Sequence, residues 1–171
     1  MKRYILTVLM TLVLFAGSAF ANGRMPQVKE KSEAEKFILQ LAKVKASEID
    51  YAYISATMFK QMFSMLGVDV ALQGVSHPLA SIKSLRNFAT TGKTGYALLK
   101  KHIAPFLQED DNVMGMELMA LSRENGTLTA IYSGSGNILV VSDSDNELSL
   151  QFIVGLDYES FVVMKESGIG F

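Results

Sequence analysis

One stretch of the chain, residues 112–155, constrains the fold more than any other, because turn residues divide it into four short strand-like segments. Asn125-Gly126 separates the first two segments, and this pair tolerates the positive φ angles of a tight hairpin. Polar or glycine-rich turns at 133–136 and 143–146 separate the others. Because short connections make each strand the neighbour of the last, the stretch predicts an antiparallel meander of four strands.

Apolar residues in this meander follow the period of two that half-buried strands show. From Leu148 to Val154 one apolar set, Leu148, Leu150, Phe152 and Val154, alternates with Ser149, Gln151 and Ile153. In the first segment the residues expected to share one side are Met114, Met116, Leu118 and Ala120. An apolar sheet face needs a cover, so we expect the rest of the chain to supply helices.

The first half of the chain contains the signals for these helices. Ser32 and Glu35 fit a capping box, in which each side chain bonds the backbone N–H of the other residue. The segment at 81–90 fits a helix or a strand, and we favour a strand. The other expected elements are helices at 33–45, 56–66 (capped by Ser55) and 96–107 (bent at Pro105), a strand at 49–54, a loop at 68–79 and a last helix through Lys165 that Asp157 caps.

This order of elements is typical of the α+β class. We expect a mostly antiparallel sheet that ends in the four-strand meander, with helices packed on one face. The length suits a single domain at 32–166, between a flexible leader at 22–31 and a tail at 167–171. Because the chain has no cysteine, its stability must come from packing.

The first 21 residues have the three parts of a secretory signal peptide. Lys2 and Arg3 precede an apolar run, Tyr4 to Phe15, which is short for a membrane span, and Ala19-Phe20-Ala21 is a small-x-small cleavage site. We therefore expect export by this signal, to the periplasm or beyond, and no membrane span after cleavage. An uncleaved membrane anchor is the alternative.

Charge and motifs exclude several classes of function. The chain has 16 basic and 17 acidic residues, which is no electrostatic footprint for nucleic acid. Asp143 to Glu147 resembles the start of a calcium loop, but Leu148 stands where that loop needs Gly and Val154 where it needs Glu. Methionines could bind Cu(I), yet methionine beside phenylalanine at helical spacing is normal core filling. We expect no metal and no cofactor.

Candidate catalytic groups are few. The absence of cysteine excludes thiol nucleophiles, and His77 and His102 are the only side chains that titrate near neutral pH without tuning. Neither histidine lies in a recognisable nucleophile or ligand motif, so no catalytic residue is assigned. A hydrolase-type enzyme remains an alternative, and it would use either histidine with a carboxylate such as Asp50, Glu117 or Asp157.

The helix expected at 56–66 is the predicted binding element. Met58, Phe59, Met62 and Phe63 help to make it apolar over most of its circumference. A helix of this kind is either buried on two sides or forms a contact surface. We predict that these four residues bind an unknown partner protein, a peptide or an apolar ligand.

Two segments carry a resemblance to a known family. The strand Tyr51-Ala52-Tyr53-Ile54-Ser55, which runs into the apolar helix, is one, and residues 148–155 leading into Asp157-Tyr158-Glu159-Ser160-Phe161 are the other. With the signal peptide, they resemble a family of small exported proteins of unknown function found mainly in Bacteroidetes-type bacteria. The resemblance covers about Ser32 to Lys165 and implies export and an α+β domain, and it carries over no catalytic residues.

These observations favour a small exported binding or interaction module without enzymatic activity. The hydrolase-type enzyme is one alternative, and an envelope-signalling regulatory component is another.

Overall fold

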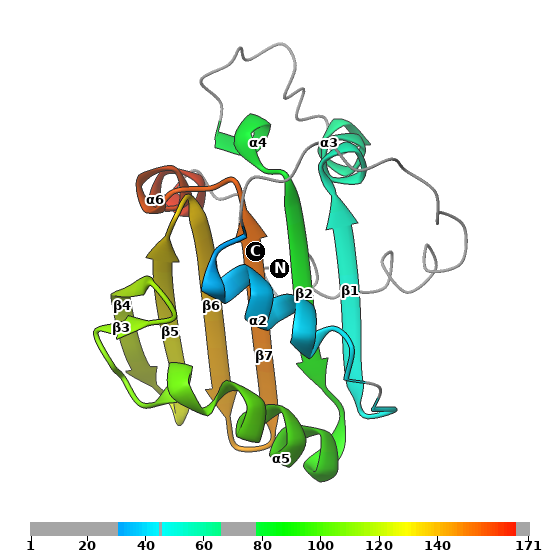
Figure 1. The fold of residues 1–171 in the computed structure, drawn as a ribbon, viewed down its shortest axis with the longest axis vertical. Helices are drawn as coiled ribbons and strands as arrows, with labels where there is room; N and C mark the ends of the chain where they lie inside the picture. The colour runs from blue at the N-terminus through cyan, green and yellow to red at the C-terminus, as the bar shows by residue number, and fades with distance from the viewer. Residues whose placement is uncertain (1–30, 45, 66–77, 167–171) are drawn as a thin grey trace.

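A computed structural model of the protein describes residues 31–44, 46–65 and 78–166 (Figure 1). The predicted signal peptide, most of the predicted leader at 22–31, the tail and most of the predicted loop at 68–79 lie outside the described residues.

Seven antiparallel strands form one sheet in the order β1-β2-β7-β6-β5-β4-β3 (Figure 1). The predicted meander is β4 to β7, and β7 joins it to β2 at the centre of the sheet. The α+β class and the C-terminal meander are therefore confirmed. The strands are β1 (Ile49–Ser55), β2 (Ser84–Thr90), β3 (Asn112–Val113), β4 (Met116–Glu124), β5 (Thr127–Gly134), β6 (Asn137–Ser144) and β7 (Glu147–Val154).

The hairpin predicted at Asn125-Gly126 is present, and both residues have positive φ angles, 51° and 79°. Such turns match the right-handed twist of the flanking strands. Met114-Gly115 and Ser135-Gly136 repeat this geometry. The turn at Met114 adds the short strand β3, which periodicity could not reveal because it has two residues.

The helices follow the predicted local signals, with shifted ends. The capping box of α2 forms: the Glu35 N–H donates to Ser32 Oγ at 3.2 Å, and the Ser32 N–H donates to Glu35 Oε2 at 3.1 Å. Pro105 lies where α5 gives way to a 3₁₀ helix. The helices are α2 (Glu33–Leu41), α3 (Ala56–Met65), α4 (Pro78–Ser81), α5 (Gly92–Ile103), the 3₁₀ helix η1 (Ala104–Leu107) and α6 (Tyr158–Glu166).

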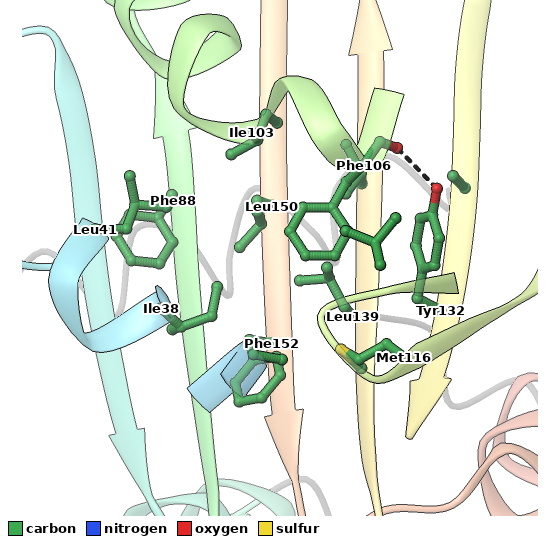
Figure 2. Close-up of a cluster of buried hydrophobic side chains, with 14 of the residues drawn as sticks. Ile38, Leu41, Phe88, Ile103, Phe106, Met116, Tyr132, Leu139, Leu150 and Phe152 are labelled. Atoms are coloured by element: carbon green, nitrogen blue, oxygen red, sulfur yellow. Dashed lines mark hydrogen bonds between the residues drawn. The ribbon is translucent and has the colours of Figure 1, made fainter. Parts of the chain in front are cut away.

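The larger core lies between one sheet face and the helices α2, α5 and η1, which cross that face in Figure 1. Phe106 of η1, 1% exposed, packs at its centre against Phe37 and Tyr132, with ring centroids 5.7 Å and 5.3 Å away. The Tyr132 hydroxyl donates to the Phe106 carbonyl oxygen at 3.1 Å (Figure 2). This bond satisfies the one polar atom of a fully buried ring.

A second, smaller core lies on the opposite face. Successive strand residues point to opposite faces, so Ile138 and Ile153 enter this core while their neighbours Leu139 and Phe152 enter the larger one. Side chains from α3, α4 and α6 pack on it. Helices therefore lie on the predicted face and also on the other.

One detail of the predicted meander is wrong. Met116, Leu118 and Ala120 were expected on one side of their strand, but the register of β4 shifts by a bulge between Leu118 and Ala120. Met116 and Leu118 consequently pack in the larger core, and Ala120 packs against the smaller one.

The Tyr132 hydroxyl should make stability depend on alkaline pH. Burial raises the pKa of Tyr132 from its ordinary value of 10.0, with a further contribution from the charge of Asp110. The neutral phenol is thus favoured in the folded state, and this stabilisation is complete below the unfolded pKa and lost as the pH rises through the folded pKa. At neutral pH Tyr132→Phe should lower the free energy of unfolding by roughly 0.5–1.5 kcal/mol.

Urea unfolding at about pH 8 and about pH 11 measures this effect. The free energy of unfolding should fall less between these two pH values in Tyr132→Phe than in the wild type. The pKa of Lys100 is also raised, so its contribution to stability is likewise lost as the pH rises, and Lys100→Met serves as the control that separates the two groups. Equal losses in Tyr132→Phe and wild type would contradict the assignment.

Candidate functional site

The predicted binding face of α3 packs on the protein's own second core. Phe59 is 2% exposed, and Met58 and Met62 are half-buried against the same cluster. As predicted, Ser55 caps the helix, with its Oγ accepting from the Met58 N–H at 3.3 Å. The Phe63 side chain lies outside the described residues. The role of these four residues in binding a partner stays a prediction.

The residues of the hydrolase alternative are not brought together in the described part of the chain. His77 lies outside it, and His102 is half-buried in the last turn of α5 with no hydrogen bond or ion pair to a carboxylate there. Asp50 lies on the edge strand β1 and Glu117 on β4, near the opposite edge. Asp157 caps α6, with Oδ1 accepting from the Ser160 N–H at 2.8 Å. Among the described members of this set, no histidine–carboxylate pair is formed.

A polar pocket of about 440 Å³ opens beside α5, against the β4–β5 and β6–β7 turns. Three side chains on its wall bond one another. The Tyr96 hydroxyl donates to Asp143 Oδ1 at 2.7 Å, and Lys100 Nζ donates to the Tyr96 hydroxyl at 2.6 Å and to Asp143 Oδ2 at 2.9 Å. Tyr96 and Lys100 are four residues apart on α5, and no sequence signal showed that Asp143 of β6 would join them.

The cluster of Tyr96, Lys100 and Asp143 has the chemistry of a structural contact between two elements. The hydrogen bonds to Tyr96 and Asp143 raise the pKa of Lys100, so its ammonium stays protonated at neutral pH and cannot serve as a base or nucleophile. Each of the three polar groups already has a partner within the cluster. The cluster therefore joins α5 to the end of β6.

The outer side of β1, at one edge of the sheet, has no neighbouring strand in the described chain (Figure 1). In an antiparallel pair, alternate residues direct both backbone groups toward the neighbouring strand. The Thr91 N–H donates to the Glu48 carbonyl at 2.9 Å, so residues 50, 52 and 54 continue this ladder to β2. The N–H and C=O groups of Tyr51 and Tyr53 consequently point outward, and no strand of the described chain pairs with them.

The same two residues expose their rings. Tyr51 is 44% and Tyr53 49% exposed, and both side chains lie on the sheet face that carries α2. The Tyr51 ring rests on Phe88, with centroids 4.9 Å apart, and the Arg86 guanidinium lies 4.9 Å from the Tyr53 ring centroid. Arg86 Nε is buried and has no hydrogen-bond partner in the described structure. We call the outer side of Ile49–Ser55, with these two rings and Arg86, the β1 edge.

Sequence reasoning found the strand and not the edge. The alternation in Ile49–Ser55 indicates a strand, but only the sheet order shows that β1 has a neighbour on one side alone. Two tyrosines at alternate positions within this strand were the available signal.

Comparison with known protein families, curated proteins and solved structures finds no significant match to this chain. The resemblance to the exported family stays a prediction, and no residue acquires a role by similarity. Within the described ranges no three metal-ligating side chains gather, and none of the helices there has the length and apolarity to cross a membrane.

Proposed function

We propose that this protein is an exported interaction module without enzymatic activity, which binds an extended polypeptide segment along its β1 edge. The unpaired backbone of β1 beside two exposed tyrosines carries the proposal. The signal-peptide pattern of residues 1–21 supports export, and the periplasm is the compartment we propose.

An open edge strand is a ready template for another strand, and natural proteins usually protect it. The common devices are lysine, proline, a bulge or a very short strand. β1 has seven residues, Ile49–Ser55, with a continuous register on β2 and with Asp50 as its one charged residue. An edge of this length without those devices is suited to strand addition, in which main-chain bonds supply affinity and alternate side chains supply specificity.

The side chains of the β1 edge suit the same role. Tyrosine and arginine are the residue types enriched among those that contribute most to protein–protein binding. Arg86 Nε gains a partner if the bound segment offers an acceptor above Tyr53. A backbone carbonyl or a carboxylate would supply that acceptor.

Tyr53→Pro should remove partner binding while Tyr53→Ala weakens it. The Tyr53 N–H points away from β2, so proline deletes an outward donor and no β1–β2 bond. Alanine loses the same ring and keeps the donor, and the difference between the two variants isolates the backbone contribution. The native mass of protein purified gently from its host measures binding, and the denatured mass in that sample reports cleavage after Ala21.

We expect added mass on the wild type, reduced occupancy in Tyr53→Ala and none in Tyr53→Pro. Circular dichroism melting of each variant shows whether the sheet is intact. Full occupancy in a folded Tyr53→Pro variant, or a wild type without added mass, would reject the proposal. The enzymatic and signalling alternatives have no supporting contact within the described residues.

A further inference from the structure

We infer that the segment that binds the β1 edge is β1 of a second copy of this chain, so that two sheets join into one across a two-fold axis. This inference rests on the proposed function, because it names the partner for the same edge. The observations that carry it are the backbone directions along β1 and the order of its side chains.

Strand geometry allows this pairing without rearrangement. In two antiparallel copies of one strand, the residue numbers of every facing pair have the same sum. All seven residues of Ile49–Ser55 are paired only when Ala52 lies on the two-fold axis. Tyr51 then faces Tyr53 of the second copy, twice by symmetry. Because both residues direct their N–H and C=O groups outward, each tyrosine pair exchanges both backbone bonds.

The side chains agree with this register. Ala52, the smallest residue of β1, lies on the axis as a pair that is not hydrogen-bonded, where strands bring their Cα atoms to within about 4.5 Å. The exposed tyrosines of both copies lie on the same sheet face, as directly opposed aromatic neighbours that stabilise strand pairing. The contact is self-complementary, as a two-fold interface requires.

Other registers fit less well. With Asp50 on the axis, the two carboxylates would face each other, and like charges directly opposite destabilise a sheet. With Tyr51 or Tyr53 on the axis, residues at one end of β1 would have no strand opposite them. In the register centred on Ala52, Asp50 faces the uncharged Ile54 of the second copy.

A cysteine at the axis tests the register directly, since the natural chain has no cysteine. Ala52→Cys should form a disulfide-linked dimer on mild oxidation, because Cα atoms about 4.5 Å apart lie within the range for a disulfide. The first control is Asp50→Cys: in this register residue 50 faces residue 54 of the second copy, so the two new cysteines lie four residues apart along the strands. The second control is Ala97→Cys, on the exposed side of α5. We expect at least about ten-fold more linked dimer for Ala52→Cys than for either control.

The native mass of the wild type completes the experiment. Two chains per particle together with selective linking at Ala52→Cys support the inference. Equal linking in all three cysteine variants, or none in Ala52→Cys, overturns it. If the added mass then belongs to another protein and is still lost in Tyr53→Pro, the proposed function stands without the second copy. A wild type that is monomeric and binds nothing rejects both.

Discussion

Replacing Phe106 with alanine should lower the free energy of unfolding by about 3–5 kcal/mol, the largest effect expected for a single substitution in this protein. The ring is 1% exposed and lies between Phe37 and Tyr132 at the centre of the larger core. Its removal leaves a cavity between η1 and the sheet, and this cavity cannot close without moving the 3₁₀ helix η1, which contains Pro105 in its first turn. It also loosens the segment whose carbonyl oxygen accepts from Tyr132.

Urea unfolding followed by circular dichroism measures this loss. Leu121→Ala is the matched control, because Leu121 is 39% exposed on β4 and should cost no more than about 0.5 kcal/mol. A loss for Phe106→Ala as small as that of the control would show that the packing of η1 on the sheet contributes little to stability.

Gly95→Ala should destabilise the protein by about 1–3 kcal/mol, although the same change stabilises most helices. Gly95 is buried in the N-terminal part of α5, and an added Cβ would meet the backbone carbonyl group and Cβ of Glu48. The Gly95 N–H also donates to Glu48 Oε2 at 2.7 Å, and the clash pushes these groups apart. The Glu48 carbonyl accepts from the Thr91 N–H as well, so the strain reaches the end of the β1–β2 pair.

The reciprocal substitution on the same helix is the control. Ala97 is exposed, so Ala97→Gly should cost about 0.5–1 kcal/mol from helix propensity alone. Thermal melting of both variants measures the change in stability, and we expect Gly95→Ala to lower the melting temperature. Stabilisation by Gly95→Ala would mean that α5 can move away from Glu48 at little cost.

The features that could be predicted from the sequence depend on residues close together in the chain. The capping box at Ser32, the turn at Asn125-Gly126 and the cap at Asp157 each involve neighbours within a few positions, and each is confirmed. Of the segment at 81–90, for which we favoured a strand, residues 84–90 form β2, and Ser81 belongs to α4 instead. Local chemistry decides such features, so one sequence suffices.

The features that could not be predicted depend on distant pairing. The pairing of β7 with β6 was predicted, but nothing near β7 in the sequence shows that its other neighbour is β2. The bulge after Leu118 is a property of the β4–β5 pair. The cluster of Tyr96, Lys100 and Asp143 likewise joins residues from α5 and β6.

The candidate binding surface illustrates the same limit. A helix as apolar as α3 has the same sequence pattern whether it covers its own sheet or a partner, and the structure places Phe59 in the protein's own core. The β1 edge required the opposite information, namely which strand has no second neighbour. Strand order across the sheet supplied it.

The central position of β7 has a consequence for the order of events during synthesis. It is the last strand to leave the ribosome, yet it alone joins the β1–β2 pair to the rest of the sheet. A nascent chain that ends before Val154 therefore has two separate pieces of sheet, and neither has its full core. Both cores are therefore completed only when almost the whole chain has been synthesised. For a protein that we propose to be exported, late completion of the native fold would favour passage through a secretion channel before folding.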